Sequence, residues 1–220
     1  MAFSTPVRLL ILIAVALVAY CFWPRTPSLT TFDPKKMAPR YEAIWRDAAS
    51  KSFSSVYWKE YFHHERDYHI PPVESLNMAG NITRAISLLQ SPSGDDRAVA
   101  NTILTEYFIR LRDVMKLNFE ASEVALQDAI WQSEPAADET RTTDPVDALA
   151  IVLSQLYGGD RGHYMDAATA IVDARKQVIE AADADSKKKA SEATLAAVQL
   201  LQVAIMNKGE GVAADTTTVQ

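Results

Sequence analysis

The pattern of apolar and polar positions divides the chain into one uncharged apolar run, residues 9–23, and a series of amphipathic segments. In those segments the apolar residues recur three and four positions apart, a spacing that places them on one face of an α-helix. Residues 56–62 could form a strand, but their apolar and polar residues do not alternate strictly, as they would in a half-buried strand. The pattern therefore predicts an all-α protein, in which one N-terminal helix precedes a bundle of about six or seven helices.

The apolar run favours a transmembrane signal-anchor over residues 1–23, which would cross the membrane once. Val7 extends the run across Arg8, whose long side chain can reach the lipid headgroups. Tyr20 and Trp23 are typical of the aromatic belt at a membrane interface. A cleaved signal peptide and a buried core helix remain alternatives, although bulky residues stand where a signal peptide would be cut.

The orientation of this anchor is less clearly marked than its position. Arg8 lies on its amino side, whereas Arg25, Lys35, Lys36 and Arg40 follow on its carboxyl side. A strict count of positive charges favours a cytoplasmic carboxyl side. A short amino tail before a single apolar run is nevertheless common in export signals, so we expect the bulk of the chain to be extracytoplasmic.

Composition divides the remainder of the chain into three parts. Residues 24–39 contain several prolines and basic residues and are expected to form an extended stem. Residues 40–209 carry the helical pattern and are long enough for one domain. Residues 210–220 are polar and are expected to form a disordered tail.

Two helical patterns inside the bundle are especially clear. Residues 95–132 contain neither glycine nor proline, and an unbroken helix of that length would extend about 55 Å. Because this is long for a compact domain, we expect a kink near 116–120. The alanine-rich segments 160–184 and 186–208 are expected to pack as an antiparallel hairpin, since small side chains allow close approach of two backbones.

The charge distribution excludes one class of partner. The net charge is −6, and the first forty residues are basic, so the acidity lies in the predicted bundle. Nucleic-acid binding requires a basic face and is not expected. The single cysteine, Cys21, lies in the apolar run, which leaves the bundle without disulfides or cysteine metal ligands. No catalytic motif is recognisable, which favours a protein that is not an enzyme.

Three of the four histidines lie within residues 63–69. On a helix, Glu60 and His64 are four positions apart, as are His63 and Asp67, so each pair can bring a carboxylate beside an imidazole. Such pairs can supply half of a transition-metal site. A charged, solvated helix end explains the same spacing without a metal.

A second candidate site is the glycine-rich connection that contains Gly159, Arg161 and Gly162. Glycine backbone amides at the start of a helix, together with an arginine, can bind an anion. The segment matches no established phosphate-binding motif, and a glycine helix end followed by a tight turn also accounts for it.

The third candidate is the aromatic group Tyr57, Trp58, Tyr61 and Phe62. Aromatic residues of this kind are common in cores, and exposed ones are frequent anchors of protein interfaces. We therefore predict a membrane-anchored helical protein that acts as a protein-binding or scaffolding module, or as an accessory subunit of a membrane complex, with no cofactor. The alternative is a helical bundle, enzyme or carrier, that binds a transition metal through the histidine cluster; a ligand-sensing domain is a weaker third possibility.

Overall fold

The computed structural model describes residues 5–91, 93–133 and 143–208 of the chain. Within these ranges every regular element is helical, which confirms the all-α prediction. The expected tail at 210–220 and most of the expected polar loop between residues 133 and 143 lie outside the described residues.

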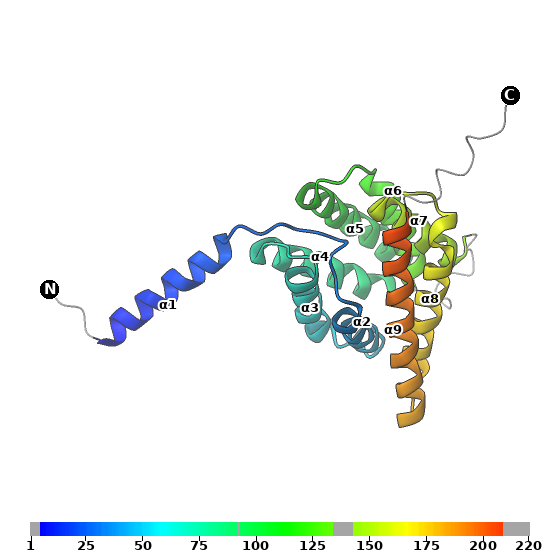
Figure 1. Ribbon diagram of the computed structural model, residues 1–220, viewed down its shortest axis with the longest axis horizontal. Coiled ribbons are helices and arrows are strands. Elements are labelled where there is room, and N and C mark those ends of the chain that lie inside the picture. The colour runs from blue at the N-terminus through cyan, green and yellow to red at the C-terminus, as the bar shows by residue number, and fades with distance from the viewer. Residues whose placement is uncertain (1–4, 92, 134–142, 209–220) are drawn as a thin grey trace.

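The elements follow one another along the chain as shown in Figure 1. The first half contains α1 (Thr5–Phe22), α2 (Pro34–Ala49), α3 (Phe53–Phe62), a π-helical turn η1 (His63–Asp67), α4 (Pro72–Leu89) and α5 (Gly94–Met115). The second half contains α6 (Ala121–Gln132), α7 (Pro145–Tyr157), a 3₁₀ turn η3 (Gly162–Tyr164), α8 (Met165–Glu180) and α9 (Ala184–Asn207).

The number of helices differs from the expectation. The described residues form nine α-helices, eight of them after α1, where six or seven were expected. One reason is that residues 95–132 do not form one kinked helix. Lys116 adopts a left-handed backbone conformation (φ 57°), which ends α5, and Phe119 turns back into the core before α6 begins. The chain reverses there, and α5 and α6 pack against each other.

The apolar run forms α1, which projects away from the remainder of the molecule (Figure 1). The expected transmembrane anchor is not supported, because none of the helices in the described ranges is long and apolar enough to cross a membrane. The physical reason is length. The 18 residues of α1 extend about 27 Å, less than the roughly 30 Å of a bilayer core, and Pro6 and Arg8 fall in its first turns.

The stem is shorter and better packed than expected. Helix α2 begins at Pro34, with the Asp33 side chain accepting a hydrogen bond from the Lys35 backbone N–H at 3.0 Å. Before it, Leu29 and Phe32 are buried in the core. The Ser28 backbone N–H also donates to the carbonyl of Tyr68 at 3.0 Å. The stem is therefore held against the domain.

The bundle is built from two groups of helices that share one core. Helices α8 and α9 lie side by side as the expected antiparallel hairpin, with α2 packed across them. Helices α3, α4, α5 and α6 pack each against the next, and the turn η1 connects α3 to α4 along the chain. Helix α7 joins the groups by packing against both α6 and α8. This arrangement brings α3, α5, α6 and α8 around one interior space.

Candidate functional site

The aromatic group of α3 lies partly on the surface. The side chain of Trp58 is 54% exposed, whereas Tyr57, Tyr61 and Phe62 are half-buried. Their rings contact one another edge to face, with ring centroids 5.1–5.9 Å apart. We call these four residues the aromatic face. The four rings therefore form one continuous group on α3.

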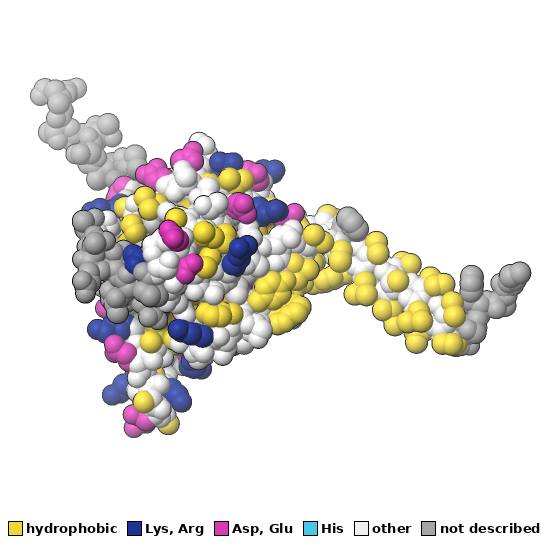
Figure 2. Space-filling model, turned by 180° about the vertical axis from the view of Figure 1, so that it is seen from behind, with side chains coloured by type: hydrophobic (Ala, Val, Ile, Leu, Met, Phe, Trp, Pro, Cys, Tyr) yellow, Lys and Arg dark blue, Asp and Glu magenta, His cyan; other side chains and the backbone are white. Residues whose placement is uncertain are grey.

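The aromatic face lies next to the end of α1, because Glu65 in η1 holds that end in place. The Tyr20 hydroxyl donates to the Glu65 carboxylate at 2.6 Å, and the Arg25 guanidinium donates to the same oxygen at 2.5 Å. Burial opposes ionisation of Glu65, but the hydrogen bonds from Tyr20 and Arg25 outweigh it and lower the pKa of this carboxyl. Figure 2 shows apolar side chains around α1 and on the adjoining part of the body.

The histidine cluster forms an internal network. His64 Nδ1 lies 2.6 Å from the Glu60 backbone carbonyl, and Nε2 lies 3.0 Å from the Tyr107 hydroxyl. Because a carbonyl only accepts, Nδ1 carries the proton and Nε2 accepts from Tyr107. Burial, together with the neighbouring His63, lowers the pKa of His64 to about 3. This imidazole is therefore a neutral structural group, with both nitrogens engaged.

Two of the other proposed metal ligands, His63 and Asp67, are also engaged. His63 Nδ1 lies 2.8 Å from the Asp67 carboxylate, and Arg40 of α2 donates to the same carboxylate oxygen and to the Phe62 carbonyl. Glu60 lies on α3 with its carboxylate oxygen 3.9 Å from His64 Nδ1. In the part of the chain that the structure describes, no three histidine, cysteine or acidic side chains converge in a way that could hold a metal.

The glycine-rich connection between α7 and η3 supplies its own carboxylate. The Asp160 side chain accepts a hydrogen bond from the His163 backbone N–H at 3.2 Å, at the place where a bound anion would be expected. Gly159 adopts a positive φ of 98°, and Arg161 lies 3.5 Å from Asp147 in an exposed ion pair. Gly162 is close to the Asp160 carboxylate. These contacts fit a helix connection.

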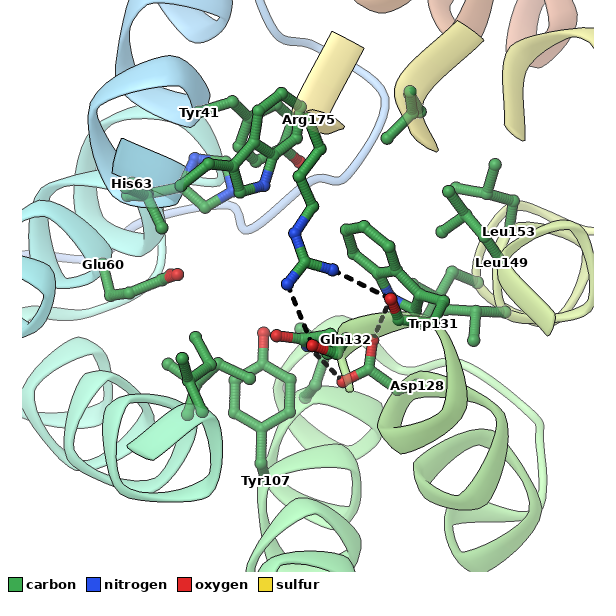
Figure 3. Close-up of a pocket in the computed structure, with 18 of the residues that line it drawn as sticks. Tyr41, Glu60, His63, Tyr107, Asp128, Trp131, Gln132, Leu149, Leu153 and Arg175 are labelled. Atoms are coloured by element: carbon green, nitrogen blue, oxygen red, sulfur yellow. Dashed lines mark hydrogen bonds between the residues drawn. The ribbon is translucent and has the colours of Figure 1, made fainter. Parts of the chain in front are cut away.

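A cavity of about 160 Å³ lies between the helices, and two of the predicted metal ligands, Glu60 and His63, line it. Figure 3 shows Glu60 from α3, Tyr107 from α5 and Arg175 from α8 pointing into it. Its lining is mainly aromatic and aliphatic, and it includes the two acids Glu60 and Asp128. The lining residues include Tyr41, Trp45, His63, Tyr68, Tyr107, Phe108, Trp131, Leu149, Leu153 and Tyr157. Three of the lining residues, Tyr41, Trp131 and Gln132, are half-buried.

Glu60 differs from the other polar groups of the cavity because its carboxylate has no hydrogen bond from the described residues. The residue is only 8% exposed. Burial, and secondarily the negative charge of Asp128, raise the pKa of Glu60 to about 8. At neutral pH this carboxyl therefore carries a proton.

Asp128 is buried as well, but it is fully hydrogen-bonded. The Trp131 indole N–H donates to one carboxylate oxygen at 2.8 Å, and the Gln132 side-chain amide donates to the other at 2.6 Å. Burial raises the pKa of Asp128 to about 6, while these bonds and the charge of Arg175 limit the rise. Asp128 is thus mostly ionised at neutral pH.

Arg175 links α8 to the end of α6. Its guanidinium donates to the backbone carbonyls of Trp131 at 2.8 Å and Gln132 at 2.9 Å. It also lies over the Trp131 ring, 5.0 Å from the centroid. These carbonyls are among those left without partners at a helix end, so Arg175 closes one wall of the cavity and supplies its positive charge.

No protein family model, curated protein or solved structure matches this chain.

Sequence reasoning considered Glu60 as a metal ligand but missed Asp128, Tyr107 and Arg175. A signal for Asp128 was present in the sequence. It continues the spacing of Val124 and Ala125 on the buried face of α6, where an acid is unusual. No comparable signal marks Arg175, because its partners are backbone carbonyls of a helix more than forty residues earlier.

Proposed function

We propose that this protein is a membrane-attached helical module that binds a protein partner next to the bilayer. The observation that carries the proposal is the bridge from Glu65 to Tyr20 and Arg25. It fixes an apolar helix, whose large side chains from Leu9 to Val18 are exposed, beside an exposed aromatic face. A partner that reaches the aromatic face would therefore lie close to whatever surrounds α1.

Helix α1 supports membrane attachment through its composition and exposure. Its large apolar side chains from Leu9 to Val18 are exposed on every side of the helix. Burying them in lipid would contribute more than about 10 kcal/mol, since each such side chain contributes about 1.5–3 kcal/mol. At about 27 Å, α1 can place this surface in lipid without matching the full thickness of the hydrocarbon core.

The aromatic face supports a protein partner more strongly than a lipid contact. Trp and Tyr are enriched among the residues that dominate interface energetics, and Trp58 is the most exposed of the four. The domain that carries the face is acidic, and an anionic lipid surface would repel it. We therefore favour a second membrane protein as the partner. Its extramembrane surface would lie beside α1 and contact the aromatic face without bringing the acidic domain onto the lipid.

Membrane attachment can be tested by alkaline extraction of native membranes. We expect the full chain to remain in the membrane fraction, and Leu12→Lys with Leu17→Lys to release it. Retention of the double variant would contradict attachment through α1. Protease digestion of sealed vesicles then reports the side, and protection from external protease in inside-out vesicles is expected for an extracytoplasmic domain.

The partner can be tested by site-specific photo-cross-linking in native membranes. A photoreactive amino acid at position 58 should give one discrete protein adduct, identified by its mass in repeated preparations. The same group at Glu192, an exposed position on α9, should not give it. The adduct should weaken with Tyr61→Ala, which removes a neighbouring ring. Lipid adducts alone at position 58, or equal adducts at both positions, would refute the partner surface.

A further inference from the structure

Among the described residues, the lining of the cavity includes two acids, Glu60 and Asp128, and one arginine, Arg175. With every group ionised, Glu60 and Asp128 each contribute a negative charge and Arg175 contributes one positive charge. Asp128 is satisfied by Trp131 and Gln132 and lies close to Arg175. The Glu60 carboxylate has no hydrogen bond from the described residues. Among those residues, the basic side chain within salt-bridge distance of it is His64, which is neutral. The cavity therefore has room for one further positive charge next to Glu60.

The walls of the cavity are suited to an organic cation. Rings of Tyr41, Tyr107 and Trp131 line the space that the Glu60 carboxyl faces (Figure 3). The face of an aromatic ring attracts a cation, and this attraction is strongest where water is excluded. Leu149 and Leu153 form an aliphatic side of the same space, which suits the apolar body of a ligand.

An anionic ligand is disfavoured by the same contacts. The guanidinium of Arg175 already donates to two backbone carbonyls. An anion would also lie near the ionised carboxylate of Asp128 and the unpaired carboxyl of Glu60. A metal ion is disfavoured because no three ligating side chains converge among the described residues.

We propose that this cavity binds a small organic amine, whose ammonium group pairs with the carboxylate of Glu60 and whose apolar body packs against the aromatic and leucine side chains. The volume of about 160 Å³ sets the size of the ligand. A cavity of about 150 Å³ can hold a benzene molecule. The ligand class is therefore a primary or secondary amine on a body of that size. This site is independent of the aromatic face and of membrane attachment.

Calorimetric titration of the full chain in mild detergent tests the proposal with three matched probes. Benzylamine, benzyl alcohol and benzoate share one apolar body and differ in charge. We expect benzylamine to bind at least tenfold more tightly than benzyl alcohol, and benzoate not to bind. Equal binding of the amine and the alcohol, or no binding of the amine at millimolar concentration, would overturn the proposal.

Two substitutions locate the site. Glu60→Gln keeps the size of the side chain and removes its charge, so it should abolish the preference for the amine over the alcohol. Glu106→Gln makes the same change at an exposed position of α5 and should leave the preference intact. If Glu60→Gln retained the preference, the ammonium would not be paired with Glu60.

Proton release gives a test that needs no variant. The groups around Glu60 are His63 and His64 from η1, Tyr41 from α2, Tyr107 from α5, Asp128 from α6 and Arg175 from α8. The histidine pKa values are lowered and the tyrosine pKa values raised, chiefly by burial, and Asp128, with a pKa of about 6, is already mostly ionised at pH 7. Among these groups Glu60 therefore undergoes the main change of charge between pH 7 and pH 8.

Binding of the ammonium at pH 7 should therefore release close to one proton, measured by titration in two buffers of different ionisation enthalpy. The affinity should rise about fivefold from pH 7 to pH 8, in proportion to the ionised fraction of Glu60. Binding of benzylamine with no proton released would contradict pairing with Glu60.

Discussion

The hydroxyl of Tyr20, near the end of α1, donates a 2.6 Å hydrogen bond to the carboxylate of Glu65 in η1. Arg25 donates to the same oxygen at 2.5 Å, and its guanidinium also lies 5.0 Å from the Tyr20 ring centroid. One acid thus joins the apolar helix, the stem and the π-helical turn. Because η1 also carries His63, which lines the cavity, the attachment of α1 and the wall of the cavity share one short segment.

Glu65→Gln should loosen the attachment of α1 without unfolding the bundle. The amide retains the shape of the side chain but loses its charge, and a hydrogen bond to a charged group contributes about 1.5–3 kcal/mol. We expect tryptic cleavage after Arg25 to become about tenfold faster, with the melting temperature of the bundle little changed. Glu106→Gln is the matched control. An unchanged cleavage rate would show that the bridge does not restrain the stem.

Glu60 should make the protein less stable as the pH rises. Its pKa is about 8 in the fold, against an ordinary value of 4.5, so the folded state binds the proton more tightly. The stabilisation is fully present below pH 4.5 and is lost as the pH rises through 8. From pH 7 to pH 9 this one group should lower the free energy of unfolding by about 1.4 kcal/mol.

Urea denaturation at pH 7 and pH 9 measures this loss. Glu60→Gln should remove that part of the decrease and should be more stable than the original chain at pH 9, because the buried amide does not ionise. A variant that kept the same loss between the two pH values would assign the effect to another group.

Arg175→Lys should destabilise the fold although the charge is kept. A lysine ammonium cannot reproduce the planar fork that donates to the carbonyls of Trp131 and Gln132. Leaving a buried carbonyl without a donor costs about 1–3 kcal/mol. These two carbonyls are partly buried, so we expect a loss of about 1–3 kcal/mol in total in chemical denaturation. Arg84→Lys, at an exposed position on α4, should change stability by less than about 0.5 kcal/mol.

Two adjacent alanines of α9 provide a direct test of the helical hairpin. Ala197 is fully buried, whereas Ala196 is exposed. Ala197→Leu should cost about 1–3 kcal/mol, because the added atoms have no space in the packed core. Ala196→Leu should leave the free energy of unfolding nearly unchanged. Thermal denaturation of both variants measures the difference. Equal effects would mean that α9 presents another face to the core.

Local signals in the sequence were sufficient where the backbone itself carries them. The start of α7 was readable from Asp144 and Pro145, and the Asp144 side chain does accept a hydrogen bond from the Val146 backbone N–H at 2.7 Å. Its end was readable from Gly158, which has a positive φ of 78°. The alanine content of α8 and α9 likewise indicated their close packing.

Other features depend on contacts that no local pattern records. The left-handed residue that ends α5 is Lys116, a residue type with no preference for that conformation. The cavity unites Glu60, Asp128 and Arg175, which lie far apart in the chain. The apolar run of α1 was readable as a helix, but the expected anchor extended one residue beyond the helix end at Phe22 and relied on the Arg8 side chain to reach the headgroups.

The docked stem has a mechanical consequence. Between α1 and α2 the chain is bonded to Tyr68 through Ser28, and Gln202 of α9 donates to the Phe32 carbonyl at 3.1 Å. Leu29 and Phe32 are each 5% exposed. A tensile force applied through α1 would therefore be transmitted directly to the C-terminal helix and the interior, with almost no slack to absorb it. The domain would tilt and rotate together with its attachment point, as a rigid lever does.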